Sequence, residues 1–115
     1  MKLHLLVLKT RQLEKLRDFY TALGIAFEVE RHGAGPVHYA GRVADLLLEL
    51  FPLNEATGPA DPMIRLGFAV EDLNVALKSV EAAGGRTVKP PQHTDWGYRA
   101  VVQDPDGRGV ELYQT

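Results

Sequence analysis

The chain has 115 residues, a formal net charge of −2 and no cysteine, and 45% of its residues are hydrophobic. This size and composition predict a single globular domain with one hydrophobic core. A balanced charge without a basic run argues against nucleic acid as the main partner, and no stretch approaches the ~20 apolar residues of a membrane span. The lack of cysteine excludes disulfides and thiol chemistry and favours a cytoplasmic location.

The first half of the chain predicts one helix and four strands. Apolar residues recur at three- and four-residue steps over 10–24, which indicates a helix with one buried face. Thr10 or Gln12 stands near the start of this helix, and Gly24 suits its C-terminal cap. The expected strands are residues 3–9, 26–31, 36–43 and 45–51.

The second half of the chain repeats this order. Its helix is expected between Asp72, a good N-cap, and Gly84, its stop. The two helices keep a constant offset to Gln12 and Gly24, since 72 − 12 and 84 − 24 are both 60. The expected strands are residues 63–70, 86–90, 98–103 and 109–113, with a hairpin turn at the sequence DPDG before the last one.

The repeat predicts an α+β fold in which two tandem βαβββ modules form a curved mixed sheet around a groove. We expect a single domain over 1–115, with module one at about 1–53 and module two at about 62–115. The segment between them, about 54–61, is rich in Pro, Gly and polar residues and is expected to be a linker.

Strand alternation places three charged residues on the face of the sheet that points away from the helices, here called the far face. Glu49 and Glu111 each stand between two apolar residues that suit the core, and Arg65 alternates with a continuous apolar set. These residues could simply be solvated strand residues. Because half-buried carboxylates need partners, we favour a convergent polar site on a concave sheet.

The motifs LEKLRDFYTALG (13–24) and TDWGYRAVVQDPDGRGVELYQ (94–114), within a duplicated module, resemble the vicinal-oxygen-chelate superfamily. This superfamily includes glyoxalase I, fosfomycin- and bleomycin-resistance proteins and extradiol dioxygenases. The resemblance covers essentially the whole chain and implies a homodimer whose grooves are completed at the interface. Because the same fold hosts lyases, transferases, dioxygenases and simple binders, the resemblance leaves the activity open.

In metal-dependent members of this family, each module supplies a His or Gln from its first strand and a Glu from its last strand. Glu49 and Glu111 match the last-strand ligands, whereas Leu5 and Arg65 occupy the first-strand positions. Leucine has no donor atom and a guanidinium has no lone pair, so we expect no metal and no cofactor. The hypothesis is that Arg65 bridges Glu49 and Glu111 as an ion cluster. A metal site that uses His4 is the alternative, if the register is shifted by one residue.

Four further residues are candidate ligand contacts. Phe51 and Tyr113 share the phase of the two glutamates and would offer apolar contact in the groove. Trp96 could border a ligand pocket or cap the core, and these alternatives carry equal weight. Arg99 could hold an anionic ligand or pair with a neighbouring acid.

The strand around His38 and Tyr39 has an ambiguous phase. The repeat pairs Tyr39 with Arg99, which slightly favours Tyr39 in the groove. His38 could be a general base or a substrate contact, but an ordinary strand histidine is the favoured alternative. His32 and His93 lie in expected turns and are interpreted as structural or incidental.

Together these residues lead to the hypothesis of a homodimer that binds a small organic molecule in a groove without a metal, comparable with the bleomycin-resistance binders. The alternative is a lyase or isomerase in which Glu49, Glu111 or His38 is the base and Arg65 stabilises an oxyanion. A metal-dependent lyase or dioxygenase is the third hypothesis and requires the shifted register.

Overall fold

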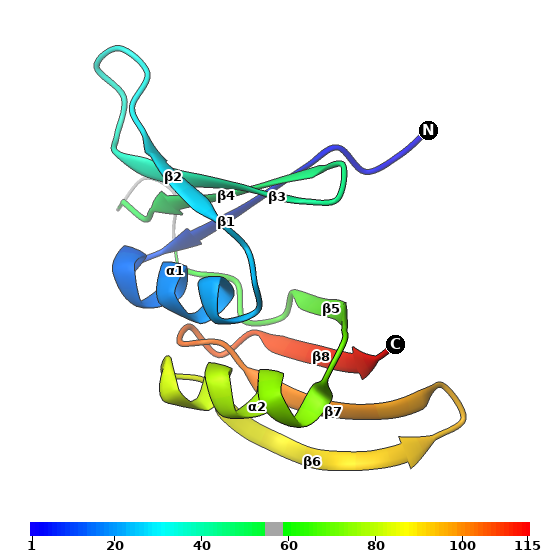
Figure 1. The fold of residues 1–115 in the computed structure, drawn as a ribbon. Coiled ribbons are helices and arrows are strands. Elements are labelled where there is room, and N and C mark those ends of the chain that lie inside the picture. The colour runs from blue at the N-terminus through cyan, green and yellow to red at the C-terminus, as the bar shows by residue number, and fades with distance from the viewer. Residues whose placement is uncertain (55–58) are drawn as a thin grey trace.

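The computed structural model describes residues 1–54 and 59–115 (Figure 1). The first module contains β1 (Leu5–Thr10), α1 (Leu13–Ala22), β2 (Phe27–Glu30), β3 (His38–Val43) and β4 (Leu46–Pro52). The second contains β5 (Arg65–Val70), α2 (Leu73–Ala82), β6 (Arg86–Thr94), β7 (Gly97–Gln103) and β8 (Gly109–Gln114). The α+β class and the two tandem βαβββ modules are therefore confirmed.

The linker expected at about 54–61 is described only in part, because residues 55–58 lie outside the described residues. Among the helices of the described ranges, none is both long enough and apolar enough to cross a membrane.

Each module forms its own four-stranded mixed sheet. The strand orders are β1-β4-β3-β2 in the first sheet and β5-β8-β7-β6 in the second. In both sheets the first and last strands of the module run parallel, and the remaining neighbours are antiparallel. The last strand of each module, β4 or β8, is therefore an inner strand with neighbours on both sides.

The helix ends follow the predicted signals. The side chain of Asp72 accepts a hydrogen bond from the backbone N–H of Val75 at 3.1 Å, as an N-cap should. Gly24 and Gly84 have φ values of 103° and 99°, the left-handed conformation that stops a helix at little cost for glycine. Helix α1 begins after Gln12 without a side-chain cap.

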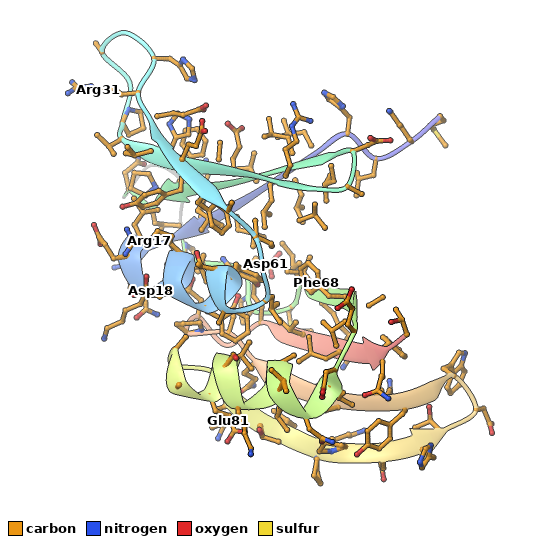
Figure 2. The ribbon with its side chains drawn as sticks, in the orientation of Figure 1. Arg17, Asp18, Arg31, Asp61, Phe68 and Glu81 are labelled. Carbon is orange, nitrogen blue, oxygen red and sulfur yellow. The ribbon has the colours of Figure 1, made fainter. Side chains whose placement is uncertain are left out.

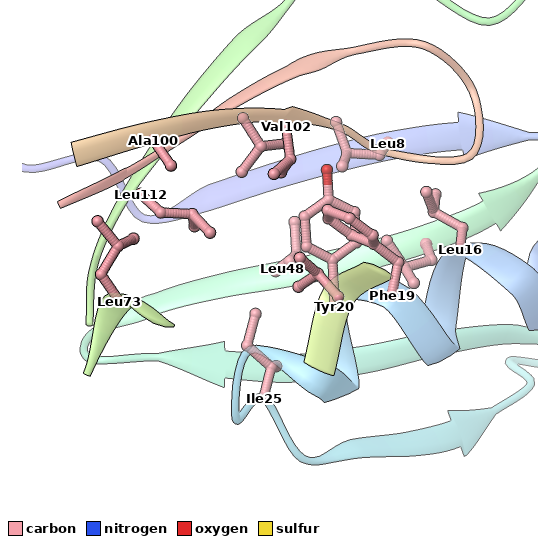
Figure 3. Packing of buried hydrophobic residues seen from close by; sticks show 13 residues of the cluster. Leu8, Leu16, Phe19, Tyr20, Ile25, Leu48, Leu73, Ala100, Val102 and Leu112 are labelled. Atoms are coloured by element: carbon pink, nitrogen blue, oxygen red, sulfur yellow. The ribbon is translucent and has the colours of Figure 1, made fainter. Parts of the chain in front are cut away.

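Both modules pack their helix-side faces into one hydrophobic core (Figure 3). Phe19 and Tyr20 of α1 lie among residues of the first sheet and of the second. The apolar neighbours of the two glutamates are at most 1% exposed: Leu48, Leu50, Val110 and Leu112. The predicted strand phase is thus confirmed, and the far faces of both sheets point away from this shared core.

A buried polar junction ties the β7–β8 turn of the second module to the first module. Arg108 is 1% exposed, and its Nη1 donates to Asp104 Oδ2 at 3.1 Å and to Asp106 Oδ2 at 3.0 Å. Its Nη2 donates to the backbone oxygen of Lys9 at 2.7 Å, and the Tyr20 hydroxyl donates to Asp104 Oδ2 at 2.8 Å. Burial, reinforced by the Asp104 carboxylate, raises the pKa of Tyr20, so its hydroxyl remains a donor. We call these five residues the Arg108 junction.

Candidate functional site

The far face of the second sheet carries a carboxylate surrounded by donors. Glu111 Oε1 accepts hydrogen bonds from the Tyr113 hydroxyl at 2.7 Å and from Arg99 Nη1, and Arg65 Nη1 lies 3.5 Å from Glu111 Oε2. The side chains of Glu111 and Arg99 are only 15% and 19% exposed, whereas that of Arg65 is 68% exposed. We call Arg65, Arg99, Glu111 and Tyr113 the Glu111 cluster.

Strand register assembles this cluster. Glu111 lies on β8, between β5 and β7, and its backbone neighbours are Gly67 and Val101. Arg65 and Arg99 each stand two residues before one of these neighbours, so their side chains reach Glu111 from both sides along the same face. The guanidinium of Arg99 also lies 6.0 Å from the centre of the Tyr113 ring, within cation–π range.

Donors around Glu111 favour its ionised form. The hydrogen bond from Tyr113, followed by the positive charges of Arg99 and Arg65, lowers the pKa of Glu111 below its ordinary value of 4.5. Because the folded pKa is lower than the unfolded pKa, the stabilisation from Glu111 is complete above the unfolded pKa and disappears as the pH falls through the folded pKa. The cluster therefore stabilises the protein at neutral pH.

We expect Glu111→Gln to lower the free energy of unfolding at pH 7 and to change it progressively less as the pH falls below about 4.5. Urea unfolding of both proteins between pH 3 and pH 7 measures this difference. The matched control is Glu28→Gln, because Glu28 is exposed and forms no ion pair within 1–54 and 59–115. A Glu111→Gln difference that stays constant over this pH range would contradict the assignment.

A shallow hollow of about 250 Å³ adjoins the Glu111 cluster. Its walls include the apolar side chains of Met63, Val88 and Val101, and Arg65 contributes a guanidinium. Met63 and Val88 are large exposed hydrophobic residues. The hollow therefore combines apolar contact with a cation that has unused hydrogen-bond donors.

The first sheet presents a related arrangement on its own far face. Glu49 is 16% exposed, and its Oε2 lies 3.6 Å from Nε2 of the buried His38. The imidazole of His38 stacks on the ring of Phe51, with centroids 4.1 Å apart and an interplanar angle of 11°. Since Ala40 lies opposite Glu49 and Val101 opposite Glu111, His38 occupies the position in the first module that Arg99 has in the second.

The predicted bridge by Arg65 between the two glutamates is wrong for this chain. Arg65 pairs with Glu111, and Glu49 pairs with His38 among the residues that the structure describes. The reason is architectural, because the glutamates lie on two separate sheets whose far faces point away from a common core.

The slight preference for Tyr39 in the groove is also wrong. The Tyr39 hydroxyl accepts a hydrogen bond from Arg17 Nη1 at 2.9 Å, and the Arg17 guanidinium lies 5.0 Å from the Tyr39 ring centre. Arg17 belongs to α1 (Figure 2), so Tyr39 faces the helix side. His38 takes the far face instead.

Trp96 and His4 lie outside both clusters. Trp96 sits in the turn between β6 and β7, is 75% exposed and forms no ring contact with the described part of the chain. Of the two alternatives for Trp96, capping of the core is therefore wrong, and contact with a ligand stays a prediction. His4 precedes β1 and is exposed, and its backbone oxygen accepts from the N–H of Leu47 at 2.9 Å.

The residues at the family's metal positions do not fit a metal. Leu5 has no donor atom, and the guanidinium of Arg65 lies beside Glu111 and can only donate. Glu49 and Glu111 lie on different sheets of the chain. These four positions therefore do not form a ligand set for a divalent ion within one chain.

Sequence reasoning missed two residues near His38. Glu30 Oε1 lies 3.4 Å from His38 Nε2 and 3.5 Å from His32 Nε2. Glu30 and His38 face each other across the β2–β3 pair. An acid and two histidines within nine residues around an expected hairpin were the available signal.

Comparison with known proteins agrees with this fold. A protein of Mycolicibacterium smegmatis (strain ATCC 700084 / mc(2)155) is 31% identical over 109 residues, which cover 95% of this chain and 90% of that protein. A glyoxalase-related enzyme from Fulvimarina pelagi superposes with a TM-score of 0.79 at 22% identity, over 100% of this chain and 88% of its own. An antibiotic-binding protein from Streptomyces sp. CB03234 superposes with a TM-score of 0.76 at 24% identity, over 99% and 95%.

The family itself follows from a sequence profile. The profile of the glyoxalase/bleomycin resistance protein/dioxygenase superfamily matches residues 2–112, nearly the whole chain. The chain therefore belongs to the glyoxalase/bleomycin resistance protein/dioxygenase superfamily.

Proposed function

We propose that this protein binds a small organic molecule that carries an aromatic ring and an anionic group, on the far face of the second sheet. The observation that carries this proposal is the exposed guanidinium of Arg65 beside an apolar hollow. Ligand sites commonly combine apolar walls with a few oriented polar groups. Among solved structures of the same fold, an antibiotic-binding protein supports a binding role.

The polar groups of the cluster divide into two kinds. Glu111 and Arg99 are half-buried and form an ion pair with each other, so their role is to stabilise the structure of this surface. Arg65 contacts Glu111 only at 3.5 Å and is largely exposed, which leaves most of its five N–H donors for a ligand carboxylate. Val101 lines the hollow together with Arg65, and the Tyr113 ring lies beside the Arg99 guanidinium.

A second copy of the chain is expected to complete the groove. The hollow of about 250 Å³ is below the range of about 300–1,000 Å³ that is usual for ligand pockets. The two far faces also differ in charge: the second sheet carries Arg65, Arg86, Lys89 and Arg99 with Glu111, and the first carries Glu28, Glu30 and Glu49 with Lys9 and Arg42. Opposite charge favours pairing of the first sheet of one copy with the second sheet of another.

Calorimetric titration with 2-naphthoate tests the proposed function. We expect 2-naphthoate to bind and the uncharged 2-naphthalenemethanol to bind more weakly. Arg65→Ala should weaken 2-naphthoate binding by about 10- to 100-fold, the effect of losing a charge-assisted hydrogen bond. The matched control is Arg11→Ala, an exposed arginine between β1 and α1 that lies outside both sheets. Equal affinities of the two compounds, or equal losses in both variants, would refute the proposal.

Proton transfer by Glu111 is less well supported than binding. A general base at neutral pH works best with a pKa near 7, whereas the donors around Glu111 lower its pKa. A lyase or isomerase activity is therefore the second candidate. Metal independence of the Glu111 cluster, the homodimer and the cytoplasmic location stay predictions.

A further inference from the structure

Four side chains on and beside the far face of the first sheet converge around one imidazole nitrogen. They are Glu30 of β2, His32 of the following loop, His38 of β3 and Glu49 of β4, here called the His38 cluster. We propose that the His38 cluster binds one Zn²⁺ ion. This inference rests on contacts within the first sheet alone.

The tautomer of a neutral His38 ring follows from its contacts. Its Nδ1 lies 3.1 Å from the backbone oxygen of Pro36, and a carbonyl oxygen only accepts, so Nδ1 carries the hydrogen. The lone pair of the neutral ring is then on Nε2. Metal-binding histidines commonly donate their other ring N–H to a backbone carbonyl in this way.

Nε2 of His38 has no hydrogen-bond partner among the described residues although it is buried, in a side chain that is 2% exposed. It faces Glu30 Oε1 at 3.4 Å and Glu49 Oε2 at 3.6 Å. The Nε2 lone pair and the two carboxylates are all hydrogen-bond acceptors, so none of them can donate to another. A cation between them satisfies all three groups at once.

Two of the ligand separations match those around a tetrahedral ion. Zn²⁺ bonds of about 2.0–2.1 Å to nitrogen and oxygen place neighbouring ligand atoms roughly 3.3–3.5 Å apart. Glu30 Oε1 lies 3.4 Å from His38 Nε2 and 3.5 Å from His32 Nε2, and the three ligand atoms lie within 4.8 Å of one another. Two imidazoles with carboxylates favour zinc over Mg²⁺ or Ca²⁺, which prefer oxygen ligands.

The fold holds most of these ligands in advance. Glu30 and His38 are register partners in adjacent strands, and the stacked ring of Phe51 fixes the imidazole plane. His32 is exposed on the loop that also carries Arg31 (Figure 2), whose Nε donates to the backbone oxygen of Gly35 at 3.0 Å. The exposed His32 gives the ion a route from solvent to the buried nitrogen.

The charge of the cluster is not neutralised by a neighbouring base. Within residues 1–54 and 59–115, no lysine or arginine pairs with Glu30 or Glu49, and the ring nitrogens beside their carboxylates belong to His32 and His38. The second module differs, because Arg99 occupies the position equivalent to His38 and neutralises Glu111. The site on the first sheet therefore has two carboxylates, Glu30 and Glu49, without a lysine or arginine partner beside the Nε2 lone pair of His38.

Zinc titration of the untagged, metal-free protein against a chromogenic chelator tests the proposal. We expect one Zn²⁺ per chain, and tetrahedral d–d absorption when Co²⁺ replaces it. Loss of supporting residues around a metal commonly costs 10- to 100-fold in affinity, so His32→Ala and Glu30→Gln should each cost at least about 10-fold. Neither His32 nor Glu30 is buried, so these variants should fold. The matched control His93→Ala replaces an exposed histidine of the second module and should bind zinc normally.

Two results would overturn the site. One is zinc affinity that is unchanged in His32→Ala and Glu30→Gln, or reduced equally by His93→Ala. The other is the absence of zinc binding together with a histidine NMR spectrum in which Nε2 of His38 carries a proton at pH 7, since a proton would then be the cation between the carboxylates.

Discussion

Replacing Arg108 with methionine is expected to lower the free energy of unfolding by about 3–5 kcal/mol, because removal of one partner leaves buried charge uncompensated. Asp104 is 3% exposed and would lose its Nη1 donor, and the backbone oxygen of Lys9 would lose its bond from Nη2. The junction joins residues far apart in sequence, so its loss should loosen the second module from β1. Urea unfolding followed by circular dichroism measures the change.

Two further variants separate this mechanism from a general effect of losing an arginine. Arg11→Met removes an exposed arginine and should change the stability by less than about 0.5 kcal/mol. Adding Asp104→Asn to Arg108→Met removes the unpaired charge and should restore part of the loss. A loss below about 1 kcal/mol for Arg108→Met would show that the junction is not an important contact between the modules.

Replacing Phe19 with alanine is the second change with a large expected effect, about 3–5 kcal/mol of unfolding free energy. Phe19 is fully buried and meets the Tyr20 ring edge-on, with centroids 4.9 Å apart. It also fills the space next to Gly85, where an added Cβ would lie 2.6 Å from Phe19 Cε2. The ring therefore packs α1 against the segment that leads into β6.

The same unfolding experiment checks the Phe19 prediction. The matched control is Trp96→Ala, because Trp96 is an aromatic residue that is 75% exposed, and a change within about 0.5 kcal/mol is expected. If both variants lost the same amount, burial between the modules would not be the source of the Phe19 contribution.

The fold can be read largely from local signals. Gly24, Gly84 and Asp72 mark helix ends through their own conformational preferences, and the structure places all three as predicted. The far-face phase of Glu49 and Glu111 is predictable because each lies between apolar residues that must be buried. These signals need no knowledge of which strands are neighbours.

The site depends on register, which the sequence alone leaves open. The module offset is 60 at the helices, but His38 and not Tyr39 corresponds to Arg99, so the middle strands are shifted by one further residue. One residue is enough to exchange the two faces of a strand. The interpretation of His32 as structural or incidental overlooks its neighbours for the same reason. Only the pairing of Glu30 with His38 across β2 and β3 brings His32 beside two other potential ligands.

The Arg108 junction could not be predicted from the average burial of each residue type. The DPDG turn is predicted correctly, and Gly107 has the expected positive φ of 91°. An arginine directly after such a turn is normally exposed. Here two acids of the turn itself and a backbone oxygen of β1 compensate its burial, and this last contact spans most of the chain.

The most direct test of the proposed function is to map the backbone amide shifts of ¹⁵N-labelled protein during titration with 2-naphthoate. The account predicts that the largest shifts fall on β5, β7 and β8 around Arg65, Arg99 and Glu111, next to the hollow. Shifts confined to the cleft lined by Ala22, Val75 and Ala76 of the two helices, or no shifts at all, would contradict it.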